Sequence, residues 1–558
     1  MIYLFISVVF ITIIVLALYF YNKAQARKAL MRIRLEWGKP KIDEFMFDSI
    51  VKYLLVSKDK SFHQLTDQTI KDLDFYRVFE FVDRTSSKIG QQFLFKKMVQ
   101  PANSVDAKIE EYAALFFDNP RLREDVQVQL IKLNNNDAYH IVSLLQDKLI
   151  PKPRWLKWAY ISLFILIVLL FLSVKYPVCW IFAIIPASIN MFVHYWNKNN
   201  SFQFSKSLPQ LNVLIEVVKV LVKKDVLFSN TLVSEAIAGF ISFNQKVRLL
   251  SFFSNGGLRD ELSQVGTYFV TLIKAFFLVE IITLFRLIDE LKLKRSFIET
   301  LFRYVGEIDV AISIASLRSG ELKTCKPEFS VDFKQLSAMN LYHPLINDCT
   351  KNNLTIINKG VLITGSNMSG KTTFLRTVAI NSILAQSMNT CFADEFKSPV
   401  LRQFSSIRIQ DDLFEGASYY LQEVSIIGSL IEASNSTSQN LFLLDEVFKG
   451  TNTHERIAAA KAILSYLNSG KNIVIVSTHD IELATMLEIE YDLFHFTETI
   501  ENDRLLFDHK IKAGPLKTRN AIKILQLAGY PKEIIDEAKT LSSDSSTKEN
   551  AQLEIEPT

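Results

Sequence analysis

Long apolar runs are the most prominent feature of the hydropathy pattern. Residues Ile2 to Tyr21 form a run of about twenty residues without a charge, which is long enough to cross a bilayer as a helix. A second block, Trp155 to Trp196, is divided by Lys175, Tyr176 and Pro177 into two further runs. The pattern predicts about three membrane spans: an anchor over residues 1–22 and a helical hairpin over residues 155–197.

Basic residues beside these runs predict their orientation. Five of them (Lys23, Arg27, Lys28, Arg32 and Arg34) follow the first run, and others flank the hairpin. Positive charge favours the cytoplasmic side, so the chain is predicted to be a multi-pass protein of the inner, cytoplasmic membrane. One alternative is a cleaved signal peptide, which needs positive charge before the apolar run. The other is a hairpin buried in a water-soluble core.

A third apolar stretch, Val265 to Phe285, is interpreted differently. It contains Lys274 and Glu280, and charges near the centre of a bilayer are costly. A crossing here would also move the rest of the chain to the outer side. We therefore predict a long buried helix of a water-soluble domain.

The remaining pattern divides the chain into helical and mixed regions. Residues 35–150 and 200–325 carry apolar side chains at helical spacing. Over residues 338–541, short β-branched runs such as Val361–Thr364, Leu441–Leu444 and Ile473–Val476 alternate with helical stretches. This alternation is typical of a parallel sheet covered by helices on both faces. The polar tail, 542–558, is predicted to be disordered.

Composition adds two exclusions. The formal net charge is only +4, so bulk basicity does not indicate a nucleic-acid-binding protein. The four cysteines are scattered along the sequence, so neither a disulfide framework nor a zinc site is indicated.

A phosphate-binding loop follows the first of the β-branched runs. Residues 365–372 match the pattern G-x-x-x-x-G-K-[ST] between a predicted strand and a predicted helix, the context that the motif requires. In such loops backbone N–H groups and the helix N-terminus hold the phosphates, the lysine reaches the β- and γ-phosphates, and the hydroxyl holds Mg²⁺. The predicted ATP-binding residues are Gly365, Ser366, Asn367, Met368, Ser369, Gly370, Lys371, Thr372 and Thr373.

Acidic residues end the second β-branched run. Asp445 is placed to hold the Mg²⁺ shell together with Thr372, and Glu446 to orient or deprotonate the attacking water. His479 follows the third run and is predicted to contact the γ-phosphate or water; the alternative is a purely structural histidine. Lys371, Glu446 and His479 are thus the catalytic candidates. The predicted fold is an α/β P-loop NTPase domain preceded by an all-α core with transmembrane helices.

Taken in order, these motifs resemble the MutS family of DNA mismatch-repair ATPases. The loop at Ile363–Arg376 resembles the family's TGPNMGGKST motif, and Asp445–Thr453 resembles its DE-x-G-R-G-T-S-T motif. Four further segments are similar to family motifs in the same order: Tyr342–Leu345, Arg408–Glu423, Ser477–His479 and Gly514–Pro531. Two segments, 65–101 and 305–315, resemble the family's helical core more faintly.

The resemblance implies a homodimer with composite ATP sites. Ser418 would cross the dimer interface to the γ-phosphate held by the other chain, whereas a local interpretation makes it a helix N-cap. The chain also departs from the family pattern: residues 35–60 leave no room for a mismatch-reading domain, and the hairpin stands where the family's DNA-gripping clamp is inserted.

Three functions are weighed from this sequence. The first is a membrane-anchored MutS-like ATPase coupled to DNA binding and related to mismatch repair. The alternative is an ATP-driven switch that acts on protein or membrane partners without DNA. A transporter of ABC type is the weakest, since three spans are few and no LSGGQ signature is present.

Overall fold

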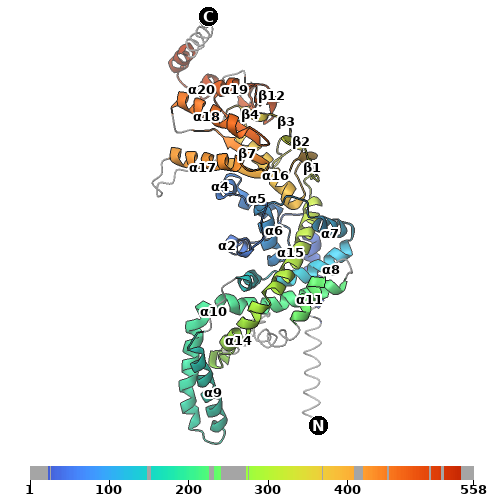
Figure 1. The fold of residues 1–558 in the computed structure, drawn as a ribbon, viewed down its shortest axis with the longest axis vertical. Helices are drawn as coiled ribbons and strands as arrows, with labels where there is room; N and C mark the ends of the chain where they lie inside the picture. Colours follow the sequence, from blue (N-terminus) through green and yellow to red (C-terminus); the bar gives the residue numbers. More distant parts are fainter. Residues whose placement is uncertain are drawn as a thin grey trace. The chain divides into compact units, whose positions relative to one another are not determined.

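The computed structural model divides the chain into two compact units (Figure 1). Unit 1 comprises residues 1–61, 79–100 and 105–321, and unit 2 comprises 62–78, 101–104 and 322–558. The structure describes residues 20, 23–25, 27–146, 153–224, 231–240, 272–273, 275–366, 368–407, 419–448, 452–501, 504–516 and 521–541. The predicted anchor (except Phe20 at its end), the predicted tail, Asn367 and Ser418 therefore lie outside the described residues.

Unit 1 is helical throughout its described part, as the apolar spacing predicts. Its elements are α2 (Phe47–Ile50), α3 (Lys52–Val56), α6 (Lys88–Val99), α7 (Ala107–Asp118), α8 (Pro120–Leu130), η1 (Ile131–Leu133), η2 (Asn136–Leu145), α9 (Leu156–Ser173), α10 (Cys179–Lys224), α11 (Thr231–Gly239), α14 (Val279–Leu293) and α15 (Arg295–Arg318). Helix α5 (Phe75–Val82) contains residues of both units.

A buried carboxylate joins α15 to the start of α6 in the core of unit 1. Asp309 is fully buried and accepts hydrogen bonds from the backbone N–H groups of Ser86 (2.7 Å) and Ser87 (2.8 Å). The Ser87 hydroxyl donates to the same carboxylate and accepts from Gly90 N–H. Burial raises the pKa of Asp309 to about 6. The packing of these two helices therefore depends on a satisfied polar contact as well as on apolar area.

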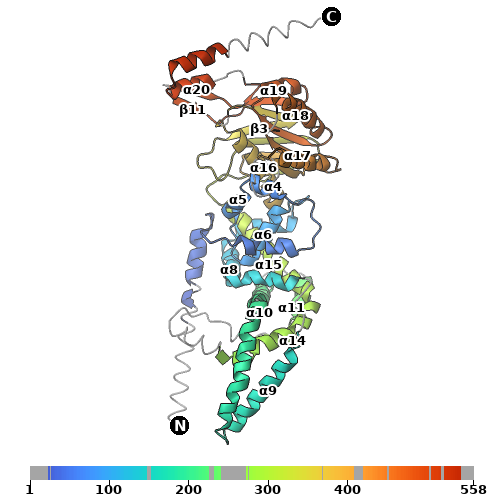
Figure 2. The same ribbon diagram turned by 90° about the vertical axis from the view of Figure 1, so that its left-hand side faces the viewer.

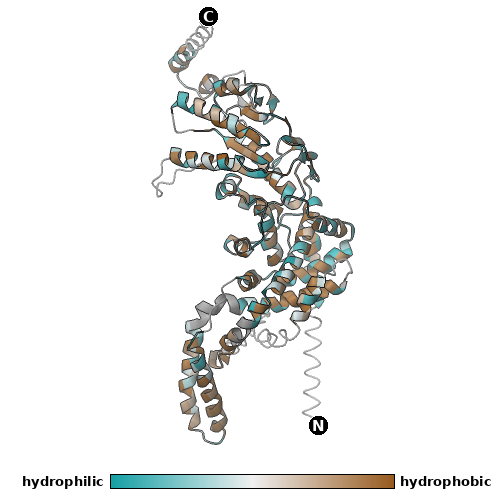
Figure 3. Cartoon of the chain, viewed as in Figure 1, coloured by the Kyte–Doolittle hydropathy of each residue, from teal (hydrophilic) through white to brown (hydrophobic). Residues whose placement is uncertain are grey.

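Helices α9 and α10 form the predicted hairpin. They run side by side in both ribbon views (Figures 1 and 2) and carry the most continuous apolar colouring of unit 1 (Figure 3). The segments Leu156–Ser173 and Cys179–Trp196 are long and apolar enough to cross a membrane, by length and composition, and only 22% of each is buried within the structure. Phe171, for example, is 79% exposed. The hairpin is therefore not buried in a water-soluble core.

The second arm of the hairpin does not end where the predicted domain boundary lies. Helix α10 continues without interruption from Cys179 to Lys224, through Pro186 and Pro209. Proline inside a helix removes one backbone hydrogen bond and commonly bends the helix without ending it. One 46-residue helix thus belongs both to the hairpin and to the helical domain predicted from residue 200.

The third apolar stretch is described only in part, at 272–273 and from 275 onward. Ala275, Leu278 and Phe285 are buried, in agreement with the predicted burial. The predicted continuous helix is interrupted, because Leu278 adopts a left-handed conformation with φ of 49° and α14 begins after it. The carbonyl of Phe276 accepts a hydrogen bond (2.8 Å) from Asn190 of the hairpin.

Unit 2 contains a parallel sheet of the predicted type. Its strand order is β12-β9-β4-β8-β7-β6, and only β12 is antiparallel to its neighbour. A smaller mixed sheet has the order β1-β5-β2-β3, and β10 pairs with β11. The strands are β1 (Glu328–Phe329), β2 (Gln335–Leu341), β3 (Asn352–Ile357), β4 (Gly360–Thr364), β5 (Glu395–Ser398), β6 (Arg402–Ser406), β7 (Asn440–Asp445), β8 (Ile473–Thr478), β9 (Tyr491–His495), β10 (Glu498–Glu501), β11 (Arg504–Phe507) and β12 (Lys512–Ala513).

Helices cover both faces of the six-stranded sheet. Side chains of α17 (Tyr419–Ser434), α18 (Thr453–Leu467) and α19 (Ile481–Leu487) form one apolar core with Leu362, Phe442 and Val474. Helix α16 (Lys371–Met388) contacts β6, β7 and β8. Unit 2 also holds α4 (Asp67–Asp72) and α20 (Ala521–Leu527). The central strands are buried on both faces, as their continuous apolar sequence indicates.

A segment from the N-terminal helical region belongs to unit 2. Within Phe62–Val78, the Asp72 carboxylate accepts from the Ser405 hydroxyl (2.6 Å) and from Ile407 N–H (3.0 Å) at the end of β6. Asp74 forms an ion pair of 3.0 Å with Arg376 of α16. The predicted helical region 35–150 is therefore divided between the two units.

Gly90 tests the buried contact in unit 1. A Cβ atom at this position would lie 2.1 Å from Oδ2 of Asp309, so Gly90→Ala is expected to lower the free energy of unfolding by about 1–3 kcal/mol through overpacking. Thermal unfolding of the purified full chain measures the change. The matched control is Gly428→Ala in α17, where an added Cβ would have no atom within 4 Å among the described residues outside the backbone of its own helix. Equal stability of Gly90→Ala and the parent chain would contradict the contact.

Candidate nucleotide site

The phosphate-binding loop lies between β4 and α16. Gly365 and Gly370 have φ angles of 147° and 111°, a region that L side chains rarely adopt. A Cβ at Gly365 would also lie 2.7 Å from the carbonyl oxygen of Phe496. The loop therefore needs glycine at both positions to turn from the strand into the helix.

Lys371 begins α16 and is buried inside the loop. Its ammonium donates hydrogen bonds to the carbonyl oxygens of Gly365 (2.7 Å) and Ser366 (2.9 Å) and lies 3.5 Å from Nε2 of His479. The Ser369 hydroxyl also donates to the Ser366 carbonyl (2.7 Å). The charge is thus held at the centre of the loop, where phosphate oxygens bind in proteins with this motif.

Thr372 and Asp445 meet at the carboxyl edge of the sheet. The Thr372 hydroxyl donates to Oδ2 of Asp445 at 2.7 Å, and the Ser477 hydroxyl donates to the other carboxylate oxygen. Strands β4 and β7 both pair with β8 in parallel register, so their carboxyl ends lie at one edge. The structure therefore brings together two residues that are far apart in the sequence.

These oxygens suit a magnesium ion. Mg²⁺ prefers oxygen ligands and is commonly held by one or two protein groups together with substrate phosphates and water. A hydroxyl and a carboxylate at hydrogen-bond distance are such a pair. Within the described residues no group of three or more His, Cys, Asp or Glu side chains is placed to hold a metal by protein ligands alone, so the fit is to an ion shared with phosphates.

Glu446 follows Asp445 in a strained turn. Its φ is 54° and that of Phe448 is 63°, unusual values for residues other than glycine, which persist where the surrounding structure enforces them. The Glu446 N–H donates to Ser477 O (2.9 Å), and Phe448 N–H donates to the buried carboxylate of Glu423. These contacts fix the turn, and Oε1 of Glu446 lies 2.7 Å from Nε2 of His479.

His479 is positioned by the loop after β8. Asp480, its neighbour, receives a bidentate contact from Arg456 of α18, at 3.3 and 2.8 Å, and its N–H donates to the Thr478 hydroxyl. Lys371, Glu446 and His479 thus converge, although their catalytic roles stay predictions. Thr373 follows Thr372 in the first turn of α16, and Met368 is 72% exposed.

A cavity of about 390 Å³ adjoins the loop, and most of its lining was missed by the sequence analysis. Tyr342, Asn352 and His509 line it together with loop residues. His509 lies 3.0 Å from the carbonyl of Ser369 through Nδ1, and its own carbonyl accepts from Asn352. Tyr342 belongs to the motif Tyr342–Leu345, and His509 precedes the motif Gly514–Pro531. Both motifs resemble the family, but neither predicts a cavity.

Comparison with known proteins identifies the same region of the chain. The sequence profile of MutS domain V matches residues 361–545. Curated proteins named DNA mismatch repair protein MutS are similar over part of the chain: 33% identical over 261 residues in Lactobacillus gasseri, 33% over 265 in Petrotoga mobilis and 29% over 256 in Thermus thermophilus.

These alignments cover 44–45% of this chain and 30–32% of each relative. The chain thus matches less than a third of the length of the curated relatives. The matched residues 361–545 contain the phosphate-binding loop, the acidic pair and the strand-end histidine, which are the motifs that suggested the resemblance. The part of the chain that carries them, residues 361–545, is a P-loop ATPase domain of the MutS type.

Proposed function

We propose that the chain binds and hydrolyses ATP at the site formed by the loop, the acidic pair and His479. The observation that carries the proposal is the 2.7 Å contact between Thr372 and Asp445 beside the buried Lys371. Lys371 and Thr372 begin α16, whereas Asp445 ends β7, so the contact joins two elements that are far apart in the sequence. ATP and Mg²⁺ are the implied substrate and metal.

The residues divide the chemistry between them. Lys371 would exchange its contacts with loop carbonyls for contacts with the β- and γ-phosphates, and Thr372 and Asp445 would hold the metal. When bound, Mg²⁺ neutralises charge on the phosphate oxygens. Glu446 orients the attacking water and accepts its proton, and His479, which already contacts Glu446, holds that carboxylate in position.

The cavity beside the loop is proposed to hold the adenine base. At about 390 Å³ it lies within the usual range of small-ligand pockets. Tyr342, Phe496 and His509 supply aromatic surface to its lining. The base would be bound mainly by apolar contact, next to loop amides that bind phosphate.

The assembly and location are proposals of the same account. Two chains are proposed to pair so that Ser418 of each completes the site of the other. The anchor and the α9–α10 hairpin are proposed to lie in the cytoplasmic membrane, with the ATPase unit in the cytoplasm. Support comes from two adjacent apolar helices whose side chains are largely exposed, since such surface is unfavourable in water.

ATP turnover is proposed to be coupled to DNA, because the curated relatives are named for mismatch repair. The alternative is a membrane-tethered switch that acts on protein or membrane partners. The hairpin favours the alternative in one respect, since it gives the helical unit a surface suited to lipid.

Lys371→Ala is expected to abolish ATP binding, because it removes the charge at the centre of the loop. Glu446→Gln should leave ATP affinity within about threefold of the parent and reduce turnover by about 100-fold or more, the usual contribution of a general base. Binding by equilibrium dialysis and hydrolysis by phosphate release measure the two effects. Lys532→Ala, an exposed lysine of the same unit, is the control. Normal hydrolysis by Lys371→Ala would refute the site.

His509→Ala tests the base pocket. We expect ATP affinity to fall by about threefold to tenfold, consistent with the loss of one ring contact, while the affinity for inorganic tripolyphosphate changes less. The comparison separates contact with the base from support of the loop through Ser369. Lys510→Ala, the exposed neighbour that does not line the cavity, serves as control. An equal loss for both ligands would argue against a base at this position.

DNA coupling is tested by the salt dependence of the ATPase rate. Duplex DNA is expected to change the rate of the full chain at about 50 mM salt and to lose its effect by about 200 mM, because phosphate contacts release counterions. Poly-glutamate of matched charge is the control for polyanion effects. If DNA leaves the rate unchanged at both salt concentrations, the membrane or protein switch is the better account.

A further inference from the structure

A second cavity, of about 310 Å³, lies in unit 1 and is distinct from the nucleotide site. Its walls come from the helical residues 27–36, the extended segment after them, the loop between α5 and α6, and the ends of α8, η1 and α15. All of these residues belong to unit 1. The cavity is therefore formed by a single compact part of the chain.

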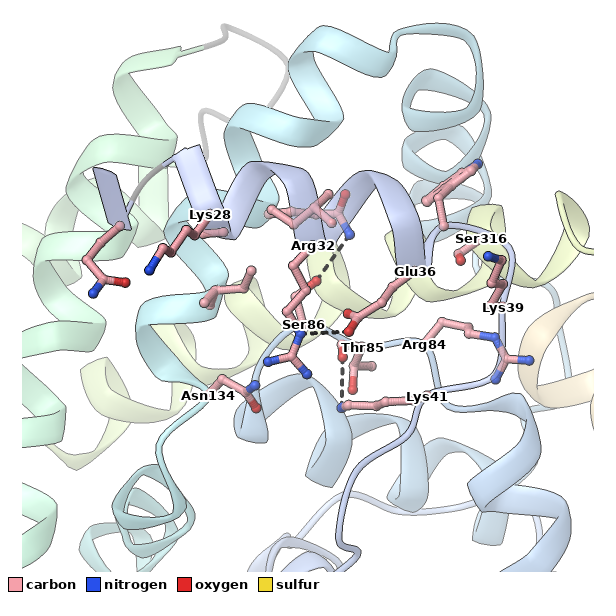
Figure 4. Close-up of a pocket in the computed structure, with 16 residues that line it drawn as sticks. Lys28, Arg32, Glu36, Lys39, Lys41, Arg84, Thr85, Ser86, Asn134 and Ser316 are labelled. Atoms are coloured by element: carbon pink, nitrogen blue, oxygen red, sulfur yellow. Dashed lines mark hydrogen bonds and ion pairs between the residues drawn. The ribbon is translucent and has the colours of Figure 1, made fainter. Parts of the chain in front are cut away.

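The lining is strongly cationic. It contains five basic side chains and one acidic side chain, which are Lys28, Arg32, Lys39, Lys41, Arg84 and Glu36. Figure 4 shows Lys28 and Arg32 on one side of the view and Lys39 and Arg84 on the other.

Two of these cations already have carboxylate partners. Arg32 pairs with Glu36 at 2.6 Å. Lys41 donates to the Thr85 carbonyl at 2.9 Å and lies 3.5 Å from Asp83. Lys28, Lys39 and Arg84 make no ion pair that the described residues show, so the cavity retains positive charge after local pairing.

Arg84 is the deepest of the cations. It is only 8% exposed, and burial lowers its pKa to about 10, so it stays charged at neutral pH. Its guanidinium donates to the carbonyls of Phe81 and Asp83, while its Nε is buried without a hydrogen-bond partner among the described residues. A buried charge is costly unless it is paired, so this position calls for an anion.

Two neutral side chains of the lining show the same deficit. Oε1 of Gln127 and Oδ1 of Asn134 are buried and lack partners among the described residues. The other end of Gln127 donates to the Ser86 hydroxyl at 3.3 Å. Buried polar atoms in folded proteins are normally satisfied by protein, water or ligand. The acceptors of Gln127 and Asn134 suit the hydroxyl groups of a ligand, as the cations suit its charge.

The apolar part of the wall sets the kind of ligand. Ile33, Trp37 and Ile131 contribute apolar surface, and the guanidinium of Arg123 lies 3.6 Å from the centre of the Trp37 ring, which holds the ring in place. A cavity of this volume is near the lower end of small-ligand pockets. It fits a phosphate group with a short hydroxylated carbon skeleton.

We propose that this cavity binds a small phosphate ester, with Lys39 and Arg84 as the cations that contact its phosphate and Gln127 and Asn134 as acceptors for its hydroxyl groups. The phosphate ester comes either from a soluble metabolite or from the headgroup of an anionic phospholipid. The lining residues begin at Gln25, directly after the apolar run that ends at Tyr21, and basic segments at such positions attract anionic lipids.

The test uses the full chain carrying Lys371→Ala, so that the nucleotide loop does not bind the probe. Calorimetric titration with sn-glycerol 3-phosphate forms one arm, and titration with short-chain phosphatidic acid in detergent micelles forms the other. Short-chain phosphatidylcholine is the matched lipid control. Saturable binding in the first arm identifies a soluble ester, and binding of phosphatidic acid alone identifies a headgroup. No saturable binding in either arm overturns the proposal.

Variants assign the binding to this cavity. Lys39→Gln, on the open side, and Arg84→Gln, on the buried side, are each expected to weaken the affinity about tenfold, as for loss of a charge-assisted hydrogen bond. Lys39→Gln keeps the test valid if Arg84→Gln does not fold. Lys132→Gln removes an exposed charge nearby that does not line the cavity and should leave the affinity unchanged. Unchanged affinity in Lys39→Gln, or equal loss in Lys132→Gln, overturns the proposal.

Discussion

The hydrogen bond between Thr372 and Asp445 depends on the alignment of three strands. Strands β4 and β7 are not neighbours; each is paired in parallel with β8, with Thr364 opposite Thr478 and Asp445 opposite Ser477. A shift of one residue in either pairing would turn the strand's side chains to the opposite face. The mainly apolar strands, buried on both sides by helices, prevent that shift. The chemistry at the sheet edge therefore rests on packing several residues away from it.

The same alignment explains why this part of the site was predictable. Each motif is local in sequence, and the rule that parallel strands end at one edge then places Lys371, Asp445 and His479 together. The cavity beside the loop was not predictable in this way. Asn352 and His509 are separated by more than 150 residues, and their contact (3.0 Å) joins the start of β3 to the segment after β11, which no motif links. Likewise, apolar spacing gave no sign that Asp72 and Asp74 belong to the ATPase unit.

In unit 1 the sequence predicted the type of each element better than the residues at which it begins and ends. The change from apolar to charged residues near Trp196 suggested a boundary, but α10 continues to Lys224, because a helix tolerates a change of environment along its axis. The opposite happened near Leu278, where the apolar segment Thr267–Phe285, which has no glycine or proline, contains a left-handed residue. The described contact of Phe276 with Asn190 occurs at this interruption. Tertiary hydrogen bonding therefore overrode the local preference for a continuous helix.

The exposed apolar surface of the hairpin bears on which partner the proposed ATP turnover acts on. Its apolar side chains face outward from the helix pair, with Trp158, Phe171 and Phe192 each at least 70% exposed, and water does not stabilise such a surface. The proposed membrane placement would cover this surface, and it agrees with the basic residues that flank the apolar segment and the aromatic residues near its ends. Both proposed functions, the DNA-coupled ATPase and the membrane switch, are compatible with the proposed membrane placement. Helix α10 forms half of the hairpin and also packs on η2, α15 and α8 within unit 1. The apolar arm is therefore continuous with the helical core. This continuity matters for either proposed function.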